Sequence, residues 1–132
     1  MKYLVAYVSA AVVFAALDAV WLSTMGNRLY RPALAPLLMD GFRLAPAVAF
    51  YVLFLAGVVI FGVSPALRSG QWTTALVMGG LFGFFCYATY DLTNMATLKL
   101  WPLKVTLVDM AWGTVLSGTS ATVAFLVAKR FG

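Results

Sequence analysis

The chain has 132 residues, of which 64% are hydrophobic and only 10% are charged. This balance excludes a water-soluble fold, because such a fold needs a polar exterior. The net charge of +5 comes from nine Lys and Arg residues scattered over termini and loops, without the basic run that binds a phosphate backbone, so we expect no nucleic-acid partner. Membrane lipids are the expected partners, since cations beside membrane spans attract anionic headgroups.

Four apolar stretches are long enough to cross a bilayer, because a helical span needs about 20 residues at about 1.5 Å each. They cover about residues 3–25, 46–63, 72–95 and 103–128. The interruptions contain charge or helix breakers: Gly26 to Arg31, Ser64-Pro65 with Arg68 to Gly70, and Lys99 to Lys104. We therefore predict an all-α fold, a four-helix transmembrane bundle that forms a single integral membrane domain over residues 1–132.

Between the first two spans, residues 26–43 are too polar to cross the membrane and predict a short interfacial segment. Tyr30, Phe42 and Trp101 suit the headgroup level, where amphipathic rings are favoured.

Four spans put both termini and the middle loop on one side, which we call side A, and the other two loops on side B. Cations are nearly balanced between Lys2, Arg68, Lys129 and Arg130 on side A and Arg28, Arg31, Arg43, Lys99 and Lys104 on side B, so the orientation stays open.

Three aspartates, Asp18, Asp91 and Asp109, stand inside the first, third and fourth spans, where an ionisable group costs free energy and usually marks function. At about 1.5 Å per residue, all three lie roughly 7 to 10 Å inside side B. Asp18 with Trp21, and Asp109 with Trp112, form Asp-x-x-Trp pairs that share a helix face. Because a buried indole N–H needs a partner, these pairs predict one polar layer in the core.

We expect this layer to be a binding site, formed by Asp18, Trp21, Tyr87, Asp91, Asn94, Asp109 and Trp112. Three carboxylates exceed what packing needs, so the layer would hold a proton, a cation or a polar headgroup. The expected rim, which would contact headgroups, consists of Arg28, Arg31, Lys99 and Lys104. Arg28, Arg31 or Lys104 could instead neutralise the carboxylates as structural ion pairs.

The chain lacks His and Glu, and Cys86 is its one cysteine. Without His there is no ligand for common zinc and haem sites and no base for a Ser-His-Asp triad. We expect no metal site and no cofactor. Cys86 cannot form an internal disulfide and is expected to be a packed side chain.

The string from Tyr90 to Gly113, YDLTNMATLKLWPLKVTLVDMAWG, strongly resembles a family of small bacterial membrane proteins called domain of unknown function 2177, or DUF2177. The Asp18-x-x-Trp21-Leu22 element is similar to the first-helix signature of that family, so the resemblance covers the whole chain. It implies a multi-pass, four-helix fold in the bacterial cytoplasmic (inner) membrane, with no established activity. It also implies a link to lipid and fatty-acid modification, because family members are often encoded beside genes for that chemistry.

Three roles for the layer stay open. The first is a transport-like binding site for a small amphipathic substrate or for protons, for which we expect a homodimer. The second is an accessory subunit beside an enzyme of membrane-lipid or fatty-acid modification, or such an enzyme itself, with Asp91 or Asp109 as general base. The third is purely structural, because interhelical polar contacts in lipid contribute on the order of 1 kcal/mol.

Overall fold

The computed structural model describes residues 1–39 and 43–132, so residues 40–42, including Phe42 of the expected interfacial segment, lie outside the described part. Within the described part the chain is helical and contains no strand. Its elements are α1 (Lys2–Met25), η1 (Gly26–Tyr30), α2 (Arg31–Leu34), α3 (Leu44–Val58), η2 (Val59–Val63), α4 (Ser64–Ser69), α5 (Trp72–Thr97) and α6 (Leu103–Phe131).

Several of these elements run into one another and form longer helical segments. Four segments are long and apolar enough to span a membrane: Lys2–Leu34, Leu44–Ser69, Trp72–Thr97 and Leu103–Phe131. The prediction of an all-α protein with four transmembrane helices is thereby confirmed. The segments differ from the predicted ones mainly at two internal points, Gly26 and Pro65.

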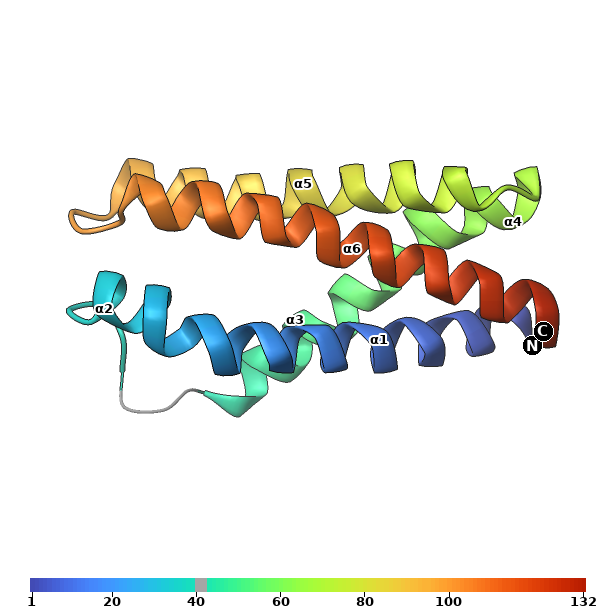
Figure 1. The fold of residues 1–132 in the computed structure, drawn as a ribbon, viewed down its shortest axis with the longest axis horizontal. Helices are drawn as coiled ribbons and strands as arrows, with labels where there is room; N and C mark the ends of the chain where they lie inside the picture. The colour runs from blue at the N-terminus through green and yellow to red at the C-terminus, as the bar shows by residue number, and fades with distance from the viewer. Residues whose placement is uncertain (40–42) are drawn as a thin grey trace.

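Helix α1 ends at Met25, where the first predicted span ends, but the helical backbone continues through η1 and α2 to Leu34. Gly26 has helical backbone angles (φ −55°, ψ −46°), and the Arg31 N–H donates to the Gly26 carbonyl five residues back, in a π-helical turn. Leu29 and Leu34 bury their side chains in a cluster with Val105, which offsets the weak helix preference of a glycine-containing turn. In Figure 1, α2 accordingly turns toward α6.

The helical backbone also continues through Ser64-Pro65, just after the predicted end of the second span. Pro65 lies in the first turn of α4, directly after the π-helical turn η2. There the Ser64 N–H donates to the Val59 carbonyl, and this wider turn makes room for a proline ring that would clash in an unbroken α-helix. The segment ends at Ser69, and Gly70 caps it with a left-handed φ of 74°, a conformation that glycine adopts without a steric penalty.

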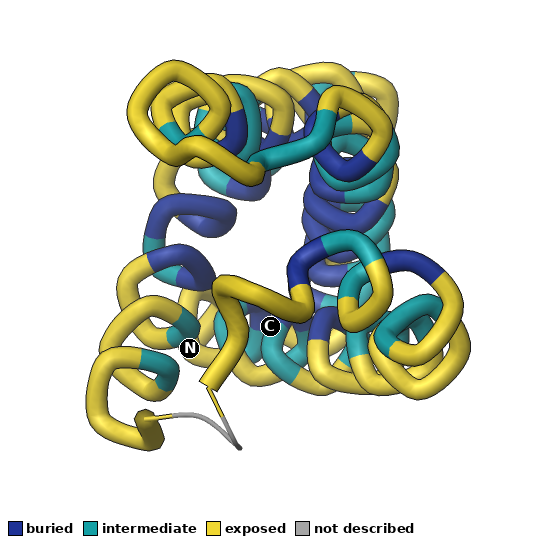
Figure 2. Tube along the Cα trace, turned by 90° about the vertical axis from the view of Figure 1, so that its left-hand side faces the viewer, coloured by how far each residue is buried: buried dark blue, intermediate teal, exposed yellow. Residues whose placement is uncertain are grey.

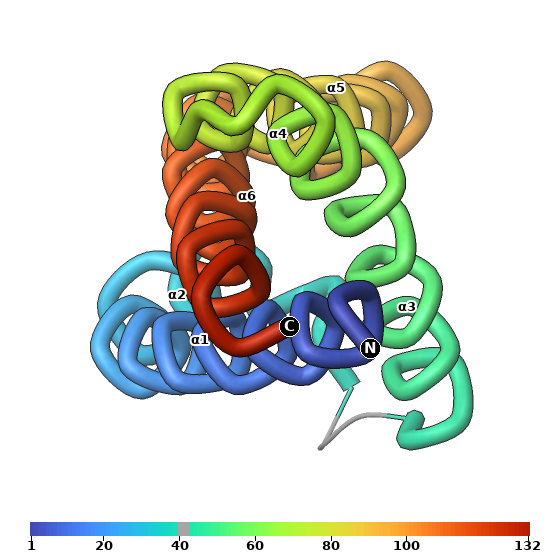
Figure 3. Tube along the Cα trace, turned by 90° about the vertical axis from the view of Figure 1, so that its right-hand side faces the viewer, coloured from blue at the N-terminus to red at the C-terminus, as the bar shows by residue number. Residues whose placement is uncertain are grey.

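Helix α6 packs between α1 and α5, and the α3 to α4 segment runs along the remaining side of the bundle (Figures 1 and 3). Both termini and the α4–α5 connection lie at one end, side A, and the α5–α6 connection lies at side B. Exposed residues cover the outside of the bundle and buried residues face its centre (Figure 2). An apolar exterior of this kind suits contact with lipid chains.

Small residues allow α5 and α6 to approach closely. A Cβ atom on Gly79 would lie 2.5 Å from the Cβ of Ala121, and one on Gly83 would overlap the Ser117 side chain. Such contacts stabilise helix pairs in lipid through van der Waals packing. The two helices therefore form a tight pair to which the remaining helices attach.

The apolar core lies mainly toward side A. Its largest fully buried side chains are Phe14, Phe125, Leu116, Val58 and Val63, all under 2% exposed. A second, smaller apolar cluster around Leu29, Leu34 and Val105 lies near side B. The polar residues of interest lie between these two apolar clusters.

Candidate functional site

The two Asp-x-x-Trp motifs meet where α1 crosses α6. The indoles of Trp21 and Trp112 stack with ring centroids 4.4 Å apart and planes 5° apart. The Trp112 N–H donates to Asp18 Oδ1 over a long 3.4 Å, whereas the Trp21 N–H donates to the Tyr30 hydroxyl (2.9 Å), which donates to Asp109 Oδ1 (2.8 Å). Trp112 therefore bonds directly to the carboxylate of the other motif, and Trp21 is linked to the carboxylate of the other motif through Tyr30.

Asp18 has a donor for each of its oxygens. The Tyr51 hydroxyl of α3 donates to Asp18 Oδ2 at 2.7 Å, and Trp112 of α6 donates to Oδ1. One carboxylate on α1 thus joins three helices. Because both oxygens are satisfied by neutral donors, this half of the layer needs no ligand.

Asp91 differs sharply from Asp18. Its side chain is 0% exposed, and within the described residues neither of its oxygens has a hydrogen-bond donor. Its carboxyl group lies within hydrogen-bonding reach of the Asp109 carboxyl group. Two carboxyl groups in contact need a proton or a cation between them, because two bare carboxylates would repel each other. This half of the layer can therefore take up a positively charged species.

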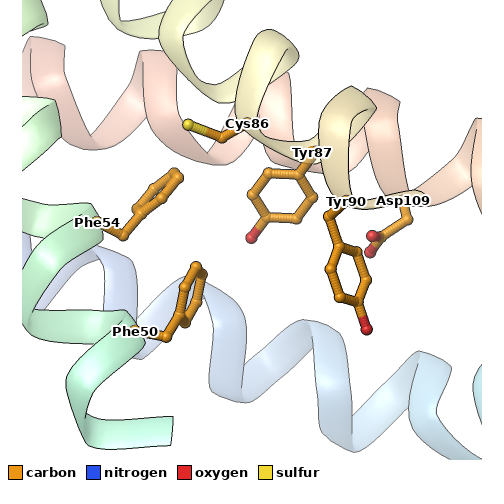
Figure 4. A pocket seen from close by; sticks show the side chains of 6 residues that line it. All are labelled: Phe50, Phe54, Cys86, Tyr87, Tyr90 and Asp109. Atoms are coloured by element: carbon orange, nitrogen blue, oxygen red, sulfur yellow. The ribbon is translucent and has the colours of Figure 1, made fainter. Parts of the chain in front are cut away.

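A cavity of about 400 Å³ adjoins this half and lies between α3, α5 and α6. Asp109 contributes the charged part of its wall, and the other lining residues are Phe50, Phe54, Cys86, Tyr87 and Tyr90. Figure 4 shows the rings of Tyr87 and Tyr90 projecting from α5 into the cavity, with Phe50 and Phe54 of α3 facing them. Phe50 and Tyr90 are 46% and 59% exposed, so the cavity opens to the outside of the bundle.

The Tyr87 ring is held in the cavity wall by the helix behind it. A Cβ atom on Gly113 of α6 would overlap this ring, so the glycine provides the room in which the ring lies. Figure 4 shows the Tyr87 hydroxyl pointing into the cavity. The spacing of Gly113 four residues after Asp109 thus places a ring and a carboxylate in the same wall.

A second cavity, of about 470 Å³, lies between α1 and α3 and includes Asp18 and Tyr51 in its wall. The rest of the wall is apolar, formed by Ala11, Phe14, Ala15, Ala19, Leu22 and Leu55. Because Asp18 already accepts two hydrogen bonds, this cavity presents less unsatisfied polarity than the first.

The structure brings most of the expected site residues together. Asp18, Trp21, Asp109 and Trp112 share one hydrogen-bonded and stacked group, and Asp91 adjoins it through Asp109. Asn94 is half-buried one turn beyond Tyr90, farther toward side B. The expected rim residues Arg28, Arg31, Lys99 and Lys104 are all exposed, and neutral hydroxyl and indole groups contact Asp18 and Asp109 instead.

Two tyrosines that complete the group were not among the expected site residues. Tyr30, expected at the headgroup level, is half-buried and bonded to Asp109, because the continued helix brings it back over the bundle. Tyr51 is the sole tyrosine of its span, and a hydroxyl in an otherwise apolar span needs a partner. That signal was present in the sequence for Tyr51, whereas Tyr30 depended on the helix continuing past Gly26.

The geometry can be set beside known proteins. No curated protein and no solved structure matches the chain. The family model described as "Predicted membrane protein (DUF2177)" matches residues 3–126, a range that contains both Asp-x-x-Trp motifs, Asp91 and the whole cavity wall. The chain therefore belongs to the DUF2177 family of predicted membrane proteins.

Proposed function

We propose that the protein binds a small amphipathic molecule from the bilayer in the cavity between α3, α5 and α6, in a transport-like role. The observation that carries this proposal is the composition of the cavity wall, which combines apolar rings with one carboxylate. The apolar part of a ligand would contact Phe50 and Phe54, and its polar part would contact Asp109. Small-molecule sites commonly combine apolar walls with a few polar groups in this way.

Access from within the membrane supports an amphipathic ligand. The side A core and the side B cluster of Leu29, Leu34 and Val105 cover the polar layer on its two ends. The cavity opens instead beside the exposed rings of Phe50 and Tyr90. Tyr90 lies seven residues before the end of α5 at Thr97, which corresponds to a depth of about 10 Å. A ligand would therefore enter laterally, from among the lipid chains.

The structural role is favoured for one half of the layer by the saturated hydrogen bonding of Asp18. We assign Asp18, Tyr51 and Trp112 to helix packing, and Asp91 and Asp109 to binding. The accessory-subunit and enzyme roles, the homodimer and the location in a bacterial inner membrane stay predictions, since no contact among the described residues favours them.

Photolabelling tests the binding site. Purified protein in phosphatidylcholine nanodiscs would be irradiated with dodecanol that carries a diazirine in its chain, a neutral probe. We expect crosslinks concentrated in the α3 peptide with Phe50 and Phe54 and in the α5 peptide with Cys86 to Tyr90, and competition by excess dodecanol.

Two variants sharpen this experiment. Cys86→Trp should fill the cavity and abolish the concentrated labelling, because Cys86 lies in its wall. Thr89→Ala is the matched control, because Thr89 is exposed and its hydroxyl bonds to the Phe85 carbonyl of its own helix. Labelling spread evenly over the exposed helix faces, and unaffected by Cys86→Trp, would refute the proposed site.

A further inference from the structure

The indole and hydroxyl donors that contact Asp18 and Asp109 are already used, whereas the Tyr87 hydroxyl, which can donate or accept, points into the cavity (Figure 4). Trp21 donates to Tyr30 and Tyr30 to Asp109, while Tyr51 and Trp112 donate to Asp18. Acceptors remain in excess: within the described residues, both Asp91 oxygens lack a donor, and Tyr30 occupies Oδ1 of Asp109. A ligand that brings donors therefore fits the unpartnered oxygens of this half of the layer.

The charges point the same way. Asp109 is the sole charged residue in the described wall of the cavity, and Asp91 adjoins it. The five cations on side B are exposed and do not line the cavity: Arg28, Arg31, Arg43, Lys99 and Lys104. A phosphate or carboxylate entering here would meet like charge with no positive partner, which is strongly unfavourable away from water.

The aromatic walls favour a cation as well. Phe50, Phe54, Tyr87 and Tyr90 line the cavity from two facing helices (Figure 4). Aromatic faces attract ammonium groups through the ring quadrupole, and this attraction is strongest where water is excluded. The rings can pack against any apolar chain, and the carboxyl groups beside them can bind an ammonium group.

We infer that the ligand of this cavity is a lipophilic amine, whose ammonium group binds Asp109 beside the buried Asp91 carboxyl group and whose apolar chain lies against Phe50 and Phe54. This inference rests on the proposed function and specifies its ligand class. An ammonium group has three N–H donors and no acceptor, which suits carboxylate oxygens that lack a donor. It can also take the place of the proton that two adjoining carboxyl groups would otherwise share.

Three probes with the same chain and different headgroups test the inference. Dodecylamine, dodecanol and dodecanoate would compete with the photoreactive dodecanol in nanodiscs, at equal mole fractions in the membrane. We expect dodecylamine to displace the label at about tenfold lower mole fraction than dodecanol, as a charge-assisted hydrogen bond implies, and dodecanoate to compete least. The Thr89→Ala control should keep this order.

Asp109→Asn and Asp91→Asn should each reduce the preference for the amine to about threefold or less, since each removes one of the two carboxylates. Labelling by the neutral probe should persist in both, which shows that the cavity still forms. Equal competition by all three compounds, or an amine preference that survives in both variants, would overturn the inference while the proposed site stands. Failure of the neutral probe to label the cavity in the unaltered protein would overturn the proposed function itself.

Discussion

Trp21 and Trp112 stack face to face, at 4.4 Å between ring centroids, across the contact between α1 and α6. The Trp112 N–H donates to Asp18 of α1, whereas the Trp21 N–H donates to the Tyr30 hydroxyl, which in turn donates to Asp109 of α6. The pair thus couples ring stacking to hydrogen bonding at one point, and it fixes the relative rotation of two antiparallel helices. Four predictions concern this pair, the groups that bond to Asp18 and Asp91, and the packing of the helices.

Removing either indole should weaken the fold. Trp21→Phe and Trp112→Phe each lose a hydrogen bond and part of the stacking, so we expect each to lower the free energy of unfolding by about 1–2 kcal/mol. A double-mutant cycle should give a coupling energy of about 0.5–1.5 kcal/mol. Unfolding in detergent measures both. Trp72→Phe is the control, because Trp72 is 51% exposed. If the losses of the two single variants simply add in the double variant, the two indoles are not energetically coupled.

Tyr51 should hold α3 against α1. Tyr51→Phe removes the hydrogen bond to Asp18 without changing the ring, so we expect a local loss of about 1 kcal/mol. Amide hydrogen exchange in Leu44–Val58 should then accelerate about fivefold, while exchange in α5 stays unchanged. Tyr90→Phe serves as control because Tyr90 is exposed. Equal acceleration in both variants would show that Tyr51 does not anchor α3.

Asparagine substitution should affect Asp18 and Asp91 in opposite ways. Asp18→Asn places an amide NH₂ against a donor from Tyr51 or Trp112, so we expect a loss of about 1–3 kcal/mol. Asp91→Asn removes an ionisable group whose oxygens lack donors, and the new amide can donate to Asp109. The free energy of unfolding should therefore stay unchanged or rise. Equal destabilisation by both substitutions would contradict the division of the layer into a structural and a binding half.

Glycine substitutions should separate tight packing from open helix surface. Gly83→Ala puts a methyl group into the Ser117 side chain and the Gly113 carbonyl, so we expect a loss of about 1–3 kcal/mol. Gly26→Ala meets no atom within 4 Å and lies in helical backbone, so it should gain about 0.5–1 kcal/mol. Melting temperatures of the two variants on either side of the unaltered protein would agree with this. A destabilising Gly26→Ala would indicate that η1 requires glycine.

The sequence was sufficient for the four spans and for the aspartates and indoles that meet between them. Apolar length and the Asp-x-x-Trp spacing depend on local geometry, which helix periodicity determines. The continuation past Gly26 and through Pro65 could not be predicted in the same way, because it depends on Leu29 and Leu34 packing against Val105 and on two π-helical turns.

The cavity could not be predicted from residue spacing along single helices either. It depends on the distance that α3 keeps from α5, and tertiary packing sets that distance. Asp91 and Asp18 look alike in the sequence, each inside an apolar span. They differ in the hydrogen-bond donors that neighbouring helices provide: Tyr51 and Trp112 donate to Asp18, whereas no donor among the described residues contacts Asp91.

The position of α6 between α1 and α5 also has a consequence for biosynthesis. The first helix emerges from the ribosome well before α6, its main neighbour, has been synthesised. During that interval Asp18 and Trp21 lie in the nascent chain without Trp112 and Asp109. The membrane must therefore accept α1 with an unpaired Asp18 carboxylate until α6 has been inserted. The hairpin of α5 and α6 is the last part of the bundle to form.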